Sequence, residues 1–209
     1  MAAPPAPRDL RAQLLRAAED EIAEVGLAAL SLRAIARRAG VSHQTPGHIF
    51  RDRAGLFTAV AQTGYDALAE ALQAGHDGVP GDDAPARLTG VGVAYVRFAL
   101  ERGALFAILT RPELSNLDDP GLAASRARPF RVLHDAVEDA VAGGWGGGAE
   151  PRALALLCWS TVHGLATLAR DGILAIDVPE ATPEELATLL SSTLVAAMGD
   201  ASQGAPAGD

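Results

Sequence analysis

Residues 31 to 50, SLRAIARRAGVSHQTPGHIF, contain two short helical patterns joined by a tight turn. Ser31 is placed to cap the first helix, because its hydroxyl can accept a free backbone N–H of the first turn. The apolar residues that follow fall at helical spacing and form one face. Gly40 marks the turn, since glycine enters left-handed backbone conformations at little cost. Ser42 is placed to cap a second helix, so the stretch predicts a helix-turn-helix.

The first turn of the second predicted helix carries the side chains that we expect to read DNA bases. Gln44 can form a paired hydrogen bond with adenine, and the methyl group of Thr45 can touch a thymine methyl. His43 lies beside them, and His48 follows one turn later. The alternative is an ordinary solvated helix turn without a ligand.

Phosphate contacts are expected from arginines around this motif. Each arginine alone is also explained as a solvated residue, so the role is assigned to the group Arg33, Arg37, Arg51 and Arg53. The backbone amides at the two predicted N-caps, Ser31 and Ser42, are further phosphate candidates.

The net charge of −9 is distributed unevenly along the chain. All 17 positive residues are arginines. From Arg8 to Arg53 there are 8 arginines and 6 acidic residues, or +2, whereas the remainder has 9 arginines and 20 acidic residues, or −11. Phosphate binding needs local positive charge, and this asymmetry places it near the N-terminus.

Several of these segments resemble TetR-family transcriptional regulators. The runs Leu30–Ala36, Ala39–Ser42 and Phe50–Arg53, followed by Leu56, are similar to the family's DNA-binding domain, over Asp9 to about Ala61. A weaker resemblance extends through the rest of the chain, where Cys158-Trp159-Ser160-Thr161-Val162-His163-Gly164 is similar to the Trp…His-Gly signature of one subgroup's C-terminal domain. The resemblance implies a homodimeric repressor that binds a palindromic double-stranded DNA operator and responds to an unknown small-molecule effector.

The chain departs from the family pattern in its recognition helix. The family usually has Tyr where this chain has Gly47, and His where it has Ile49, and both family residues commonly touch phosphate. Lys is replaced by Arg53, which keeps the charge. Because Pro46 and Gly47 also disfavour helix formation, the hypothesis is a recognition helix that is loosely ordered without DNA and short of phosphate contacts.

Composition and helical periodicity predict an all-α protein. The chain is 49% hydrophobic and 21% charged, and no strand pattern or repeat is visible. We expect a helix-turn-helix domain of three helices at 8–55, a C-terminal helical ligand-binding and dimerisation domain at 56–200, and disordered tails at 1–7 and 201–209. Helices are predicted at 9–25, 32–38, 42–50, 56–74, 86–102, 103–109, 122–142, 150–170 and 182–199.

The sequence predicts a particular local structure for each of several segments in the C-terminal half. A loop is predicted at 75–85, and Gly143–Gly148 is interpreted as a flexible connector. A bend is expected at Pro129, since proline cannot donate the helical hydrogen bond. The helix at 150–170 is apolar nearly all round, as expected of an element buried on both sides.

Aromatic residues of the middle helices are candidates for a ligand pocket, with a filled core as the alternative. The candidates are Tyr95, Phe98, Phe106, Phe130, His134, Trp159 and His163. Trp159 and His163 share a helix face; we interpret them as a core tryptophan above a hydrogen-bonded histidine, with a pocket wall or conformational relay as the alternative. The expected dimer interface joins the last two predicted helices through Leu165, Leu186, Leu190 and Leu194.

No enzyme signature is present. Residues 144–149 match a dinucleotide-binding pattern formally, but they follow a helix where that fold requires a strand. The histidines are scattered, and no metal site or cofactor is predicted. The other hypotheses are a small-molecule binding protein with a vestigial helix-turn-helix and an α-helical enzyme.

Cysteine content and hydropathy predict a cytoplasmic, soluble protein. Cys158 is the single cysteine, which suits a reducing compartment and is interpreted as a small core residue. The N-terminus lacks the apolar core of a signal peptide, and the longest apolar run is too short to span a bilayer, so no membrane association is expected.

Overall fold

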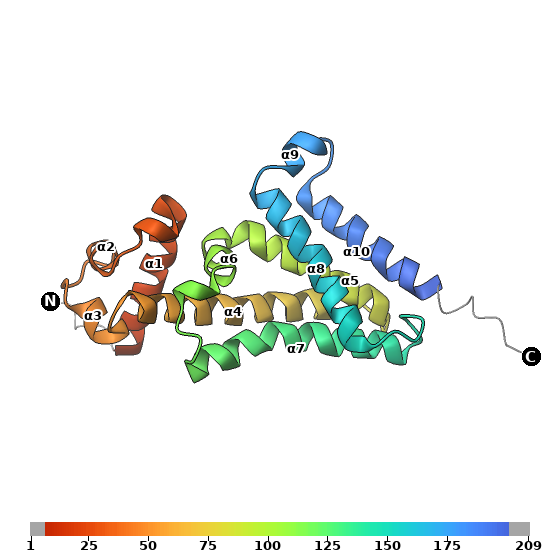
Figure 1. Cartoon of the computed structure of the whole chain (residues 1–209), viewed down its shortest axis with the longest axis horizontal. Helices are drawn as coiled ribbons and strands as arrows, with labels where there is room; N and C mark the ends of the chain where they lie inside the picture. Colours follow the sequence, from red (N-terminus) through yellow and green to blue (C-terminus); the bar gives the residue numbers. More distant parts are fainter. Residues whose placement is uncertain (1–6, 201–209) are drawn as a thin grey trace, which may run out of the picture. The chain divides into compact units, whose positions relative to one another are not determined.

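The computed structural model describes residues 7–200, with side chains from Leu10 to Gly199. Within that range the chain forms ten α-helices, one 3-10 helix and no strand (Figure 1), so the predicted all-α fold is confirmed. Of the two proposed tails, only Pro7 falls among the described residues, and it begins the first helix. The helices are α1 (Pro7–Ala29), α2 (Leu32–Arg38), α3 (Thr45–Phe50), α4 (Arg53–Asp77), α5 (Ala84–Glu101), α6 (Gly103–Leu109), η1 (Pro112–Leu114), α7 (Pro120–Ala142), α8 (Pro151–Arg170), α9 (Leu174–Asp177) and α10 (Pro183–Asp200).

The chain divides into two compact units. Unit 1 contains the residues up to Asp66 together with Arg102–Arg126, and unit 2 contains Ala67–Glu101 together with the residues from Ala127 onward. Unit 1 therefore holds α1, α2, α3, α6, η1 and the first parts of α4 and α7. The domain boundary proposed from the sequence, between 55 and 56, assigns α6 to the C-terminal domain, whereas α6 packs against α1 in unit 1.

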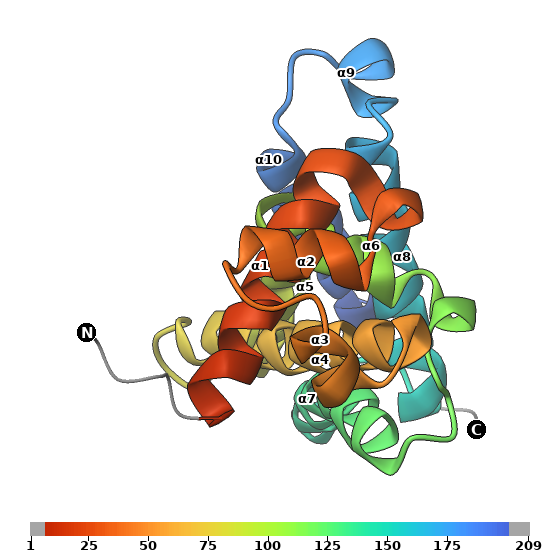
Figure 2. The same cartoon turned by 90° about the vertical axis from the view of Figure 1, so that its left-hand side faces the viewer.

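In unit 1, α2 packs against both α1 and α3 (Figure 2). Gly26, with φ 79°, interrupts the regular helix directly after its predicted end at residue 25, and one further turn reaches Ala29. Glu21 is only 4% exposed and accepts a hydrogen bond from Arg38 Nε at 2.8 Å. Arg38 also pairs with Glu24, and its hydrogen bonds to Glu24 and Glu21 raise the pKa of Arg38. These ion pairs join α1 to α2.

Unit 2 is built on α5, α8 and α10, which pack against one another. The buried side of α5 includes Leu88, Val91, Tyr95, Phe98 and Ala99, which recur at helical spacing. Gly92 lies at the crossing, where a Cβ would come within 2.5 Å of Ser191 Oγ on α10 and 3.2 Å of Val162 on α8. The absence of a side chain at Gly92 therefore lets α5 approach its two neighbours closely.

The loop predicted to begin at Gly75 starts later, because α4 continues to Asp77. A Cβ on Gly75 would lie 2.6 Å from the Gly90 carbonyl oxygen, and one on Gly90 would lie 2.4 Å from the Gly75 carbonyl oxygen. The two glycines thus allow α4 and α5 to pack at short range. Gly75 serves helix packing and does not end the helix, so this boundary prediction is wrong.

The segment Gly143–Gly148 is anchored to α10, and its interpretation as a flexible connector is wrong. Trp145 is 5% exposed, and its Nε1 donates a hydrogen bond to the Val195 carbonyl at 2.7 Å. The Gly146 amide donates to the Met198 carbonyl at 3.3 Å. The surrounding glycines adopt positive φ, which lets the chain turn tightly around the buried indole.

Helix α8 buries one face, although the sequence predicted burial on both sides. Its buried residues are Leu154, Ala155, Cys158, Val162, Leu165 and Ala166. The other side exposes Leu156, Leu157, Trp159 and Leu168. Within the described residues, α8 is the one helix whose length and composition suit a membrane span, a property that a core helix of a soluble protein shares.

Candidate functional site

The turn between α2 and α3 is held by local hydrogen bonds. Ser31 Oγ accepts from the Ala34 amide at 3.1 Å, as predicted for the N-cap of α2. Gly40 has φ 66°, and the amides of Gly40 and Val41 donate to the carbonyls of Arg37 and Ala36. This is the Schellman arrangement that ends helices at a left-handed glycine. The predicted helix-turn-helix is therefore present.

Helix α3 begins at Thr45, three residues after the predicted cap. Ser42 Oγ accepts from the Gln44 amide at 3.4 Å, within a turn that precedes the helix. A helix that started at Ser42 would need residue 46 to donate to the Ser42 carbonyl, and Pro46 has no N–H. The position of Pro46 thus explains why α3 is only six residues long.

The residues predicted to read bases lie on the exposed side of this short helix. His43, Gln44 and His48 are exposed, whereas Thr45 is half-buried. The opposite side packs inward through Pro46 and Phe50. The exposed side therefore offers imidazole and amide groups, which can hydrogen-bond to base edges.

The arginines predicted to contact phosphate differ in whether their guanidinium groups already bind other residues of the chain. The Arg33 guanidinium is exposed and has no hydrogen bond or ion pair within the described chain. Arg37 is also exposed and comes no closer to Glu21 than 3.9 Å. Arg53 is engaged: its Nη2 donates to the carbonyls of Leu27 and Ala28, both at 2.9 Å, and its guanidinium lies 5.1 Å from the Phe57 ring centre. Arg53 thus ties the start of α4 to the end of α1.

The aromatic candidates of the C-terminal half do not form one group. Tyr95 Oη lies 2.8 Å from His163 Nδ1, and the rings of Trp159 and His163 are 5.8 Å apart. Burial lowers the pKa of His163. Phe98 is buried in unit 2, and Phe106 is buried in unit 1. Trp159 is 42% exposed, so its interpretation as a core tryptophan is wrong for the single chain.

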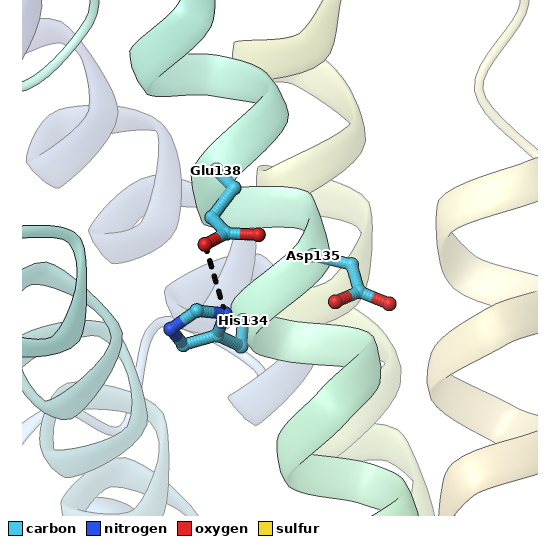
Figure 3. Close-up of side chains that lie close together, drawn as sticks. All are labelled: His134, Asp135 and Glu138. Atoms are coloured by element: carbon cyan, nitrogen blue, oxygen red, sulfur yellow. Dashed lines mark ion pairs between the residues drawn. The ribbon is translucent and has the colours of Figure 1, made fainter.

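Phe130 and His134 form a separate ring pair on α7, with centroids 6.3 Å apart. His134 Nδ1 also lies 3.6 Å from Glu138 Oε1 (Figure 3). With Asp135, these side chains place a nitrogen and two carboxylate oxygens within 4.8 Å of one another. Both carboxylates are exposed, and spacing along a single helix is enough to bring His134 and Glu138 together.

The predicted dimer residues differ in exposure. Leu190 is 39% exposed, Leu186 and Leu194 are half-buried, and Leu165 is only 5% exposed. Leu165 therefore packs inside unit 2 and offers no surface to a partner. The predicted interface included the helix of α8, but the residue named on that helix was the buried Leu165 and not its exposed leucines. We call the exposed leucines of α8 and α10 the leucine face: Leu156, Leu157, Leu168, Leu189 and Leu190.

Comparisons with known proteins match both halves of the chain to one family. Residues 14–60 match the model of bacterial regulatory proteins of the tetR family. Residues 88–194 match the model of a tetracyclin repressor-like C-terminal domain. No curated protein matches the chain significantly.

Solved structures resemble the chain over nearly its whole length. A protein of unknown function from Rhodococcus sp. RHA1 is 32% identical, with a TM-score of 0.80, and the match covers 91% of this chain and 95% of that one. Two others show the same fold at lower identity. The TetR-family transcriptional regulator PfmR from Thermus thermophilus has 17% identity, a TM-score of 0.69 and coverage of 88% and 97%. A tetR-family regulatory protein from Rhodococcus RHA1 has 20% identity, a TM-score of 0.68 and coverage of 89% and 96%.

Proposed function

The chain belongs to the TetR family of bacterial regulatory proteins, and we propose that it represses transcription as a homodimer on a palindromic operator. Membership makes it a DNA-binding transcriptional regulator and not an enzyme. The proposal adds the sign of regulation, the symmetry of the DNA site and the response to a small molecule. It also places the protein in the cytoplasm, where it would reach its operator.

The observation that carries the proposal is the exposed side of α3. Gln44 and His43 precede the helix on its solvent side, Thr45 begins it, and His48 follows one turn later. In a helix-turn-helix, residues at the start of the second helix contact base edges in the major groove. We assign base contacts to these four residues and phosphate contacts to Arg33 and the amides near Ser31 and Ser42.

Dimer formation follows from the leucine face. A palindromic operator is read by two recognition helices about 34–36 Å apart, so two copies of the chain are required. The leucine face lies on α8 and α10, which pack side by side in unit 2 (Figure 1). Two such helix pairs meeting across a two-fold axis would form a four-helix bundle and bury on the order of 2,000 Å².

The effector is proposed to bind in unit 2. The hydrogen-bonded pair Tyr95 and His163, flanked by Trp159, is the polar group that could orient a mostly apolar ligand. Repression is relieved if the ligand binds more tightly to the state that cannot engage the operator. This requirement concerns affinity alone and leaves the chemical identity of the ligand open.

Selection of bound duplexes from a random DNA pool tests the proposal. We expect enrichment of a palindrome whose half-site centres are about one helical turn apart. Analytical ultracentrifugation of the same preparation should give a dimer at micromolar concentration. Enrichment of a single half-site, or a monomer that binds the operator, would contradict the proposed symmetry.

A further inference from the structure

Arg51, directly after α3, has a strained backbone. Its φ is 68° and its ψ is −62°, and it is the one residue other than glycine with positive φ among residues 7–200. The Asp52 amide donates to the Phe50 carbonyl at 2.9 Å across it. These values describe a γ-turn of the rare kind, which costs on the order of 1–3 kcal/mol for a residue with a side chain.

Contacts on both sides hold the turn in this conformation. Phe50 is buried, and Asp52 Oδ1 accepts from the Gly55 amide at 2.8 Å, which caps the start of α4. A Cβ on Gly55 would lie 2.0 Å from the Phe50 carbonyl oxygen, so glycine is needed where α4 passes the turn. The turn needs no side chain at position 51, and glycine there would avoid the strain.

The Arg51 side chain is exposed and available. Its guanidinium has no hydrogen bond, ion pair or ring contact within the described residues. Arg53, two residues later, is occupied by the Leu27 and Ala28 carbonyls. Arg51 is also the C-cap of α3, where its amide donates to the Gly47 carbonyl at 2.9 Å.

From this geometry we propose that Arg51 contacts a DNA phosphate at the end of the recognition helix. Arg53 is exposed as well, but its Nη2 is held by the Leu27 and Ala28 carbonyls, whereas the Arg51 guanidinium has no such partner in the described residues. The strained backbone is retained because a guanidinium at this position binds DNA, which glycine cannot do. The inference rests on the DNA-binding function of the chain and assigns that function a further residue.

Replacing Arg51 with glycine separates the backbone strain at this position from the proposed phosphate contact of its side chain. Loss of strain should keep or raise the melting temperature, by about 2–4 °C for a chain of this size. Loss of one phosphate contact should weaken operator binding about tenfold per half-site at 0.1 M salt, and lower the slope of log affinity against log salt by about 1 per half-site. Binding to an unrelated duplex of equal length should weaken by a similar factor, since phosphate contacts carry no sequence information.

Two further variants and a control complete the experiment, in which fluorescence anisotropy measures DNA binding at salt concentrations between 50 and 300 mM NaCl. R51Q keeps the strain and an unbranched polar side chain but removes the charge, so it should reproduce the loss in slope, whereas R51K should retain the wild-type slope. R131Q removes an exposed charge from α7 in unit 2, away from the leucine face, and should leave binding unchanged. Wild-type affinity and slope in both R51G and R51Q would overturn the proposal. A wild-type protein that binds no duplex would instead contradict the DNA-binding function itself.

Discussion

The exposed side of α3 and the leucine face of α8 and α10 are both open to solvent, but their chemistry is opposite. The first presents His43, Gln44 and His48, and the second presents leucines, among which Leu189 is 58% exposed. Polar groups lose little by remaining in water and can exchange it for base edges, whereas apolar side chains gain free energy when a partner covers them. The difference supports the proposal that the first surface binds DNA and that the second binds another copy of the chain.

Charged substitutions on the leucine face should have the largest effect. Leu157→Asp combined with Leu190→Asp removes two apolar contacts and places four carboxylates near the two-fold axis. We expect dimer dissociation to increase by at least about a thousandfold, as for two interface hot spots, with operator affinity lost in parallel. Sedimentation velocity across a concentration series measures this. Leu117→Asp, which changes an exposed leucine of unit 1, should remain dimeric; equal disruption by this control would remove the leucine face from the interface.

On α3, Gln44→Ala should affect recognition without affecting assembly. Loss of a paired contact to adenine should cost about 1–3 kcal/mol and relax base preference at one position per half-site. Binding to a panel of operators with single base changes measures the preference. Gln73→Ala is the matched control, since Gln73 is an exposed glutamine of α4 in unit 2. Retained preference in Gln44→Ala would mean that Gln44 is only solvated.

Substitution by alanine should change the stability of the protein in opposite directions at two glycines of the helix-turn-helix. Gly47 has open space around its Cβ position and no positive φ, so Gly47→Ala should stabilise α3 by up to about 1 kcal/mol. Gly40 has φ 66°, so Gly40→Ala should destabilise the protein by about 1 kcal/mol. Urea denaturation compares the two variants, and the same sign for both would contradict the geometry of the turn.

Gly47→Tyr extends this comparison to DNA. We expect a higher operator affinity through helix propensity and a restored phosphate contact, with an almost unchanged salt slope because tyrosine is neutral. A lower affinity would mean that DNA approaches the Gly47 backbone closely, and the phosphate-deficit hypothesis would be wrong.

We expect Cys158 to have the smallest role in DNA binding by α3 and in dimer formation by the leucine face. Burial raises the pKa of its thiol to about 11, so at pH 8 roughly one molecule in a thousand carries the thiolate. Iodoacetamide should therefore alkylate the native protein at least about a hundredfold more slowly than the urea-denatured protein. Rapid native alkylation would show that α8 opens, and Cys158 would then lie on an accessible surface.

Signals that act within a few residues were predictable from the sequence. The Ser31 cap, the left-handed Gly40 and the helical start at Thr182-Pro183 depend on neighbouring amides and carbonyls. In the structure Thr182 and Glu185 exchange hydrogen bonds of 2.8 and 3.2 Å, as a capping box does. The exposure of His43, Gln44 and His48 beside the turn could be predicted for the same reason, since a helix-turn-helix is defined by local spacing.

Local sequence patterns were thus enough to predict the all-α class and the helix-turn-helix, whereas the availability of individual side chains depends on packing between distant segments. Arg51 and Arg53 look alike in the sequence, but the α1 carbonyls that occupy Arg53 lie 25 and 26 residues away. Trp145 is buried through a contact 50 residues distant, while Trp159 stays exposed. The hydrophobicity of a side chain predicts that it favours burial. It does not predict which distant residues bury it, because that depends on which surfaces the folded chain packs together.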